Sequence, residues 1–456
     1  MTGQISHGQA TAGASPGRRR FPVRPARAGL AVAVAAVLAL PALTVAGGAA
    51  MAAASAGRTP AEMHAAGAGR PAIAGSTGAG TASKHVLGWG SDADGQLGDG
   101  GTTTSNDTPV AAKLPAGTKV TQVREGCFHT LALTSKGHVL AWGAGSLGQL
   151  GDGTTTDSLT PVQVKLPSGT KVTAVRAGCF FSVALTSKGH VLAWGSNVDG
   201  QLGDGTTTTS DTPVRVKLPA GAQATGISAG ENFGLARTAK GHVLAWGLND
   251  NGQLGNASTA NSSTPVRVLL PAGAVVTTMT AGENFALAGT SGGGLFAWGA
   301  NDLGQFGNGT TTSSDTPVEV FILVRGPSIG HLVSLAAGFS HTLALFSSGA
   351  LLAWGNNNVG QLGNGTTTSS DTPVGVLLPA GAHVKAIGAA NFDGFALTVK
   401  GHVLTWGYNA SGELGNGTTT SSDTPVRVDL PTGWRALAAG SGPDAATMLA
   451  IVHKKS

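Results

Sequence analysis

Apolar and polar residues alternate in short runs along most of the chain after residue 84. In the stretch 189–241, such runs lie around 190–194, just after 212–214, around 224–228 and around 233–237. Gly, Pro, Asn and Asp separate the runs, which is typical of short strands joined by tight turns. Beyond the N-terminal region, no window has a persuasive helical period. This stretch therefore predicts four short strands.

The same stretch is repeated along the chain, and a Trp-Gly pair marks each copy. Successive tryptophans are 53, 52, 52, 52, 56 and 52 residues apart, and a nearly fixed period of this length indicates a repeat architecture. The tryptophans are Trp89, Trp142, Trp194, Trp246, Trp298, Trp354 and Trp406. Seven units of four strands predict an all-β fold, a seven-bladed β-propeller of four-stranded antiparallel blades.

The two ends of the array predict how the ring closes. The array opens at residues 85–90 without the strands that precede this segment in other units. It finishes at 434–452 with those missing strands. N- and C-terminal strands that share one blade would close the ring and remove two free sheet edges.

Each repeated residue has a structural role that needs no chemistry. Tryptophan is large and apolar with one N–H donor, so it suits the gap between blades. Gly200 and Gly203 allow a close approach of the backbone, and pairs such as Asp204-Gly205 form turns. We therefore assign all seven Trp-Gly tryptophans to the structural repeat.

A set of short motifs recurs in every unit and resembles the regulator of chromosome condensation repeat family. In one unit the motifs are Trp142-Gly143, Gly148-Gln149-Leu150-Gly151, Pro161-Val162 and Ala177-Gly178. The resemblance covers residues 84–452. It implies a seven-bladed propeller whose terminal segments share a blade.

The resemblance also implies candidate functions. The founding eukaryotic member exchanges guanine nucleotide on a small nuclear GTPase through loops on one face, so exchange activity is one alternative. The family's frequent His after the Ala-Gly strand is present at His129 and His341, while the other aligned units have Phe181, Phe233, Phe285 and Asp393. Some secreted bacterial propellers of this kind resemble inhibitors of β-lactamases. A secreted enzyme inhibitor or a carbohydrate-binding protein is therefore a further alternative.

The N-terminal region has the order of an export signal. Arginines at 18–20 precede an apolar run from Ala28, and small residues follow as far as Ala56. We predict a Sec or twin-arginine signal over residues 1–56, a flexible Ala/Gly/Ser/Thr linker over 57–83 and the propeller over 84–456. An uncleaved membrane anchor is the alternative, because the apolar run is long enough to span a bilayer. No span is expected after removal of the signal.

The basic residues at the N-terminus account for the net charge of the chain. The formal charge is +5, and five arginines lie in residues 1–56, where there is no acid. Subtracting five from 28 basic residues leaves 23 against 23 acids in residues 57–456. A basic face that releases counterions from phosphate is not evident from this composition, and we predict no nucleic-acid partner.

No set of residues in the repeats predicts catalysis, a metal or a cofactor. The sequence has no Gly-x-Ser-x-Gly elbow, no His-Glu-x-x-His pair and no phosphate loop. Cys127 and Cys179 occupy equivalent places one repeat apart. A disulfide needs Cα atoms within about 7 Å, and equivalent strands of neighbouring blades are usually further apart. We therefore expect two small buried thiols, with a bridge as the alternative.

One departure from the repeat predicts a binding loop. From Pro317 to Gly338 the chain advances 21 residues, whereas Pro213 to Gly230 takes 17, so four residues are inserted. Non-identical loops are where a symmetric scaffold acquires a binding site. The alternative is a longer edge strand that packs on its own blade. The candidate residues are Phe321, Ile322, Leu323, Val324 and Arg325.

Together these patterns predict an exported propeller that is not an enzyme. We expect a monomer in the secreted fraction or the cell envelope, which binds an unidentified protein partner through its rim loops and needs no cofactor.

Overall fold

The computed structural model describes residues 84–322 and 329–455, and all regular structure in these residues is β-strand. The predicted export signal and linker lie outside the described residues, as do Leu323, Val324 and Arg325. Among the described residues, no helix is present that could cross a membrane.

Twenty-eight strands form seven separate four-stranded sheets. Six of them contain four strands that are consecutive in the chain. These six blades are β3 (Val120–Glu125), β4 (His129–Thr134), β5 (Val139–Gly143) and β6 (Ser158–Gln163); β7 (Val172–Ala177), β8 (Phe181–Thr186), β9 (Val191–Gly195) and β10 (Ser210–Arg215); β11 (Ala224–Ala229), β12 (Phe233–Thr238), β13 (Val243–Gly247) and β14 (Ser262–Arg267); β15 (Val276–Ala281), β16 (Phe285–Thr290), β17 (Leu295–Gly299) and β18 (Ser314–Glu319); β19 (Leu332–Ala337), β20 (His341–Phe346), β21 (Leu351–Gly355) and β22 (Ser370–Gly375); and β23 (Val384–Ala389), β24 (Asp393–Thr398), β25 (Val403–Gly407) and β26 (Ser422–Arg427).

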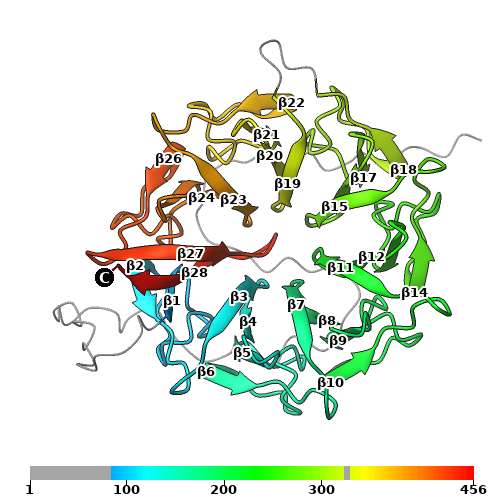
Figure 1. Ribbon diagram of the computed structural model, residues 1–456, viewed down its shortest axis with the longest axis horizontal. Helices are drawn as coiled ribbons and strands as arrows, with labels where there is room; N and C mark the ends of the chain where they lie inside the picture. The colour runs from blue at the N-terminus through cyan, green and yellow to red at the C-terminus, as the bar shows by residue number, and fades with distance from the viewer. Residues whose placement is uncertain (1–83, 323–328, 456) are drawn as a thin grey trace, which may run out of the picture. The chain divides into compact units, whose positions relative to one another are not determined.

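The seventh blade combines the N-terminal and C-terminal strands of the propeller. Its strands are β27 (Trp434–Gly440), β28 (Thr447–Lys454), β1 (Lys84–Gly90) and β2 (Asn106–Ala111), in that order across the sheet. Strand β1 pairs antiparallel with β28, and Leu87 faces Ala450. The blades follow one another around a ring in which β3, β7, β11, β15, β19, β23 and β27 are innermost (Figure 1). The predicted fold and ring closure are confirmed.

A latch built from two repeated motifs connects each blade to the next. Each Trp of a Trp-Gly pair is completely buried, and its indole N–H donates to a backbone carbonyl of the preceding blade, in a loop whose sequence is Gly-Gln-Leu-Gly in five copies, Gly-Gln-Phe-Gly at 304–307 and Gly-Glu-Leu-Gly at 412–415. Trp194, for example, donates to the carbonyl of Gln149 at 2.9 Å. The other six bonds are Trp89 to Glu413, Trp142 to Gln96, Trp246 to Gln201, Trp298 to Gln253, Trp354 to Gln305 and Trp406 to Gln361.

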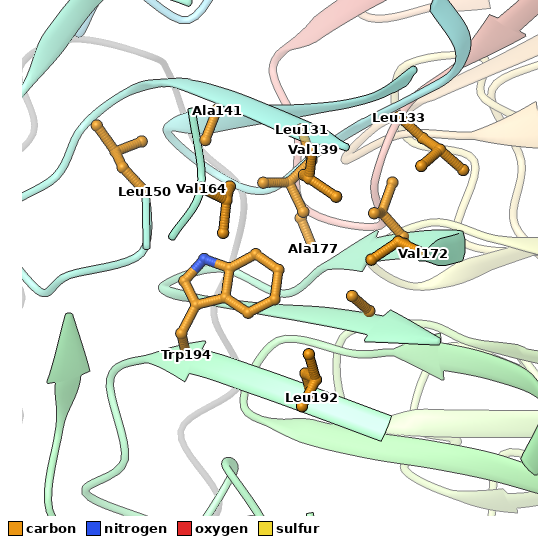
Figure 2. Packing of buried hydrophobic residues seen from close by; sticks show 12 residues of the cluster. Leu131, Leu133, Val139, Ala141, Leu150, Val164, Val172, Ala177, Leu192 and Trp194 are labelled. Atoms are coloured by element: carbon orange, nitrogen blue, oxygen red, sulfur yellow. The ribbon is translucent and has the colours of Figure 1, made fainter. Parts of the chain in front are cut away.

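Glycine at the end of the same loop makes the latch possible. Gly151 has φ of 68°, in the left-handed region, and a Cβ there would lie 2.6 Å from the indole nitrogen of Trp194. The indole therefore packs directly on backbone. Around it, apolar residues of two blades pack together, including Leu150 and Val164 from one blade and Leu192 from the next (Figure 2). The core thus lies between the blades.

The two ends of the ring carry different connections. We number the four strands of each blade from the channel outward. The loop between the first and second strands lies at one end of the ring, which we call the mouth face. Because all pairs are antiparallel, the loops between third and fourth strands lie at this end too. Ala144 N donates to the carbonyl of Phe128 at 2.8 Å and joins the two kinds of loop. The opposite face holds turns such as 135–138 and the crossings between blades, such as 164–171.

The latch predicts the effect of removing one indole. Trp246→Ala is expected to lower the free energy of unfolding by about 3–5 kcal/mol, because it leaves a large cavity between two blades and an unpaired carbonyl at Gln201. Trp246→Phe keeps most of the aromatic side-chain volume and should lower the free energy of unfolding by less. Chemical unfolding followed by tryptophan fluorescence measures both. Equal losses for the two variants, or no loss, would contradict a latch made of packing and a hydrogen bond.

Candidate functional site

The innermost strands surround a channel that is lined mainly by small side chains. The lining includes Ala177, Ser228 and Ala281, and the cavity has a volume of about 120 Å³. Two arginines also contribute to the lining, Arg124 of β3 and Arg176 of β7. A cavity of this size can accept a side chain but not a folded segment, so the accessible chemistry lies at its openings.

Seven loops between the first and second strands surround one opening of this channel, and we call them the inner loops. They are 126–128, 178–180, 230–232, 282–284, 338–340, 390–392 and 441–446. Glycine begins most of them because neighbouring loops nearly touch. A Cβ on Gly126 would lie 2.3 Å from the carbonyl oxygen of Gly178, and one on Gly230 would lie 2.5 Å from that of Gly282. The Ala-Gly motif therefore allows seven blades to converge.

Backbone hydrogen bonds link several inner loops into a chain around the opening. Cys179 N donates to the carbonyl of Glu231 at 2.9 Å, and Glu231 N donates to that of Glu283 at 3.1 Å. Further round, Asn391 N donates to the carbonyl of Ala445 at 3.2 Å. Each donor is the residue directly after the Gly or Ala that begins its loop. The backbone is thus shared, while the side chains at these positions are free to differ.

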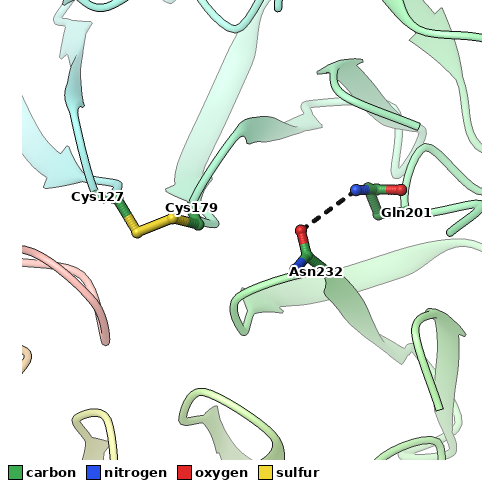
Figure 3. Close-up of a disulfide and its surroundings, with 4 residues drawn as sticks. All are labelled: Cys127, Cys179, Gln201 and Asn232. Carbon is green, nitrogen blue, oxygen red and sulfur yellow. Dashed lines mark hydrogen bonds between the residues drawn. A yellow bond between two sulfur atoms is a disulfide. The ribbon is translucent and has the colours of Figure 1, made fainter. Parts of the chain in front are cut away.

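The expectation of two free thiols is wrong: Cys127 and Cys179 form a disulfide. Their Cα atoms are 4.5 Å apart, and both residues lie on adjacent inner loops (Figure 3). The expectation rested on the spacing of equivalent strands on neighbouring blades, which is too wide for a disulfide. These cysteines instead follow Gly126 and Gly178 at the inner rim, where the loops converge to near contact. The bridge joins the first two complete blades at the channel opening.

Three acids occupy other parts of the same opening. Burial raises the pKa of Glu283 to about 9, and the charges of Asp444 and Glu231 add to the effect. Burial and the charge of Glu231 also raise the pKa of Asp444 well above its ordinary value. For Glu231 the causes of its raised pKa are burial and then Asp199. The charged groups that act on these three carboxyls are therefore acids.

Aromatic rings occupy the remaining parts of the opening. Beside the disulfide, the ring centroids of Phe128 and Phe180 are 5.6 Å apart. On other blades, Phe339 and Phe392 are 5.4 Å apart, and Phe392 also meets Tyr408 edge-on at 6.5 Å. Phe128 is 39% exposed, which is unusual for a ring of this size. The opening therefore combines exposed aromatic surface with acids.

The family's histidine position lies just inside the opening and is buried. His129 Nε2 is 2.8 Å from Ser182 Oγ on the next blade, and burial lowers the pKa of His129 to about 3. Burial also lowers the pKa of His341, to about 4. Both imidazoles are thus neutral at physiological pH. Phe181, the equivalent residue of the next blade, is completely buried, and this position supports the core rather than a ligand.

The described part of the predicted binding loop of the fifth unit, Phe321 and Ile322, lies away from this opening. It follows β18 on the opposite face, because Ser314 pairs with Gly299 at the mouth face and the strand runs away from there. Phe321 is 66% exposed, whereas Ile322 packs partly buried against a core cluster. Its role in binding stays a prediction. The seven latch tryptophans lie in the core.

The family of the chain follows from comparison with known proteins. The model of the RCC1-like domain matches residues 76–448, which is most of the chain. The chain belongs to the RCC1-like family. The ultraviolet-B receptor UVR8 of Arabidopsis thaliana is 30% identical over 347 residues, covering 75% of this chain and 77% of the receptor. The E3 ubiquitin-protein ligase HERC2 of Homo sapiens is 32% identical over 299 residues, which are 64% of this chain but 6% of HERC2.

Two solved structures share the fold of this chain. Human WBSCR16 has a TM-score of 0.72 at 24% identity, and the match covers 82% of this chain and 99% of that one. Yeast RCC1 (Prp20), in its structure with Kap60, has a TM-score of 0.73 at 23% identity and covers 82% of this chain and 90% of its own. At these identities the likeness establishes the fold alone.

The raised pKa of Glu283 predicts how pH acts on stability. Its ordinary value is 4.5, so between about pH 4.5 and 9 the unfolded chain releases a proton that the folded protein retains. This carboxyl therefore costs the fold more stability as pH rises through that window. Glu283→Gln is expected to raise the free energy of unfolding by about 1 to 3 kcal/mol at pH 8 and to change it little at pH 4.

Chemical unfolding at the two pH values checks this expectation. Glu319→Gln, which removes an exposed acid from the outermost strand β18, is the matched control and should leave stability nearly unchanged. A gain from Glu283→Gln that is equal at both pH values, or a loss at pH 8, would contradict the account of the acidic opening.

Proposed function

We propose that this protein is an exported, non-enzymatic interaction scaffold that binds a protein partner through the inner loops of the mouth face. The proposal rests on the positions at which the amino-acid sequences of the repeats differ most. After the shared Gly or Ala, the next two residues of the inner loops are Cys-Phe, Cys-Phe, Glu-Asn, Glu-Asn, Phe-Ser and Asn-Phe, and the seventh loop is longer. Side chains that differ on a common backbone are what a specific interface requires.

Relatives support protein binding as the general role. Yeast RCC1 (Prp20) has been solved bound to Kap60, and it has binding properties to Gsp1p and histones. For this chain, the exposed ring of Phe128 and the partly buried rings of Phe180, Phe339 and Phe392 at the opening favour the same class of function, because aromatic side chains are enriched at protein interfaces. The rim therefore has residues suited to anchor a partner.

Photo-crosslinking tests which face binds. A photo-reactive amino acid in place of Phe128 on the mouth face is compared with one in place of Lys136, an exposed residue on the opposite face. Both proteins are exposed to the envelope and secreted fractions of the producing cells. We expect a discrete crosslinked protein from position 128 and none from 136. Crosslinking from 136 alone, or none from either position, would reject the mouth face as the binding surface.

Export is supported by the disulfide as well as by the N-terminal sequence. Disulfides persist in oxidising compartments and are rare in the cytosol, and Cys127–Cys179 is formed in the structure. Protein recovered outside the cytoplasm is expected to begin after residue 56 and to carry this bridge, which intact-mass and N-terminal sequencing detect. Protein confined to the cytoplasm, with residues 1–56 retained and both thiols reduced, would refute export.

A further inference from the structure

The charges of the propeller are separated between its two ends. At the mouth face, the inner loops and the loops between third and fourth strands contain no Lys or Arg. Their acids are Asp92, Asp94, Asp99, Asp152, Asp157, Asp199, Asp204, Glu231, Asp250, Glu283, Asp302, Glu413 and Asp444. The balanced charge of residues 57–456 thus conceals an acidic face.

The opposite face has the reverse composition. In the described connections at that end, the only acid is Asp429. The lysines of these connections are Lys113, Lys119, Lys136, Lys165, Lys171, Lys188, Lys217, Lys240 and Lys400. A positively charged partner that approaches the ring is therefore attracted to the mouth face and repelled from the other.

A longer inner loop brings a third acid into the opening. Residues 441–446 connect β27 to β28, where the other blades use three residues, and the end of β27 reaches toward the middle of the ring (Figure 1). The loop packs tightly on the neighbouring blade, since a Cβ on Gly442 would lie 1.8 Å from the carbonyl oxygen of Glu125. Thr447 Oγ1 also donates to Glu125 Oε2 at 2.9 Å. The position of the loop is therefore fixed by the ring.

Asp444, on this loop, has no hydrogen-bond partner for its carboxyl group. Its side chain is 8% exposed, and both carboxylate oxygens are buried without a hydrogen bond. Glu231 and Glu283 belong to blades across the ring from it, yet Asp444 and Glu231 both act electrostatically on Glu283. Buried polar groups are nearly always hydrogen-bonded, so a carboxylate with two unpaired oxygens indicates a missing donor.

The arginines of the channel do not supply that donor. Arg124 Nη1 donates to the carbonyl of Val123 at 2.6 Å, and Arg176 Nη1 donates to that of Val175 at 2.8 Å. Both bonds are made within the arginine's own strand, on blades other than those of Glu231, Glu283 and Asp444. The acids are thus left for a ligand from outside.

We propose that Glu231, Glu283 and Asp444 receive a lysine or arginine side chain of the protein partner, inserted into the channel opening. The inference rests on the proposed function and specifies the partner's chemistry. Among residues 84–322 and 329–455, no three His, Cys, Asp or Glu side chains are grouped as metal ligands, so a metal ion is a control in the test and not the proposed ligand. The cavity of about 120 Å³ that the inner strands enclose is lined by Arg124 and Arg176 and by none of these three acids, so the cation is placed at the opening and not in that cavity. The neighbouring aromatic pairs offer apolar and cation–π surface to residues that flank the inserted cation.

Calorimetric titration of the full-length chain with defined probes tests the proposal. The probes are a capped tetralysine peptide, the same peptide with every lysine Nε-acetylated, and calcium chloride alone. We expect binding of tetralysine only. The double variant Glu231→Gln/Glu283→Gln should weaken it at least about tenfold, and Asp444→Asn should weaken it too. Glu319→Gln, which removes an acid elsewhere, should bind like the unmodified protein.

Three results would overturn the proposal. They are unchanged tetralysine binding by the double variant, equal binding of the acetylated peptide, and binding of calcium without binding of tetralysine. Asp444→Asn is isosteric, and the thermal unfolding midpoint of each variant is measured to confirm folding. Crosslinking from position 128 separates this inference from the proposed function. A partner that crosslinks equally to the double variant leaves protein binding intact and rejects the acidic receptor, whereas no crosslinked partner at all rejects the function itself.

Discussion

The hydrogen bond and packing between each latch tryptophan and the preceding blade hold this ring together. The indole N–H reaches a backbone carbonyl of the Gly-Gln-Leu-Gly loop, and glycine lets the ring lie flat on that loop, as Gly151 does for Trp194. The same bond joins Trp89 to Glu413, across the junction between the two ends of the propeller. Seven equivalent latches therefore close the ring. Removing one latch weakens the packing between two neighbouring blades as well as the core that they share.

Closure of seven blades imposes a second constraint at the centre. The inner loops nearly touch, so six of the seven begin with Gly or Ala, and in several of them the backbone of the next residue makes hydrogen bonds between loops. The side chains that follow have no structural role that is common to all seven loops. They include a disulfide, two aromatic pairs and acids, all at one opening. The symmetric scaffold thus concentrates its differences at the mouth face, and the proposed site follows from the same geometry that closes the ring.

Much of this fold could be predicted from the sequence, and less of the site. The Trp-Gly period and the split terminal unit determined the number of blades and the shared seventh blade, because both depend on local patterns that repeat. The pairing of Cys127 with Cys179 was missed because it depends on distance from the ring axis, and the available signal was their position directly after Gly126 and Gly178. The opposed charges were missed because net charge sums over both faces. Assigning each loop to an end of its strand would have revealed them.

The most direct test of the central claim, that the acidic opening of the mouth face receives a cationic side chain, is a crystal structure of the full-length chain with the capped tetralysine peptide. The account predicts one lysine ammonium within hydrogen-bond distance of carboxylate oxygens of Asp444 and of Glu231 or Glu283, with the rest of the peptide against the aromatic rim. A peptide bound on the outer strands or on the lysine-bearing face, with the opening unchanged and Asp444 still without a donor, would contradict it.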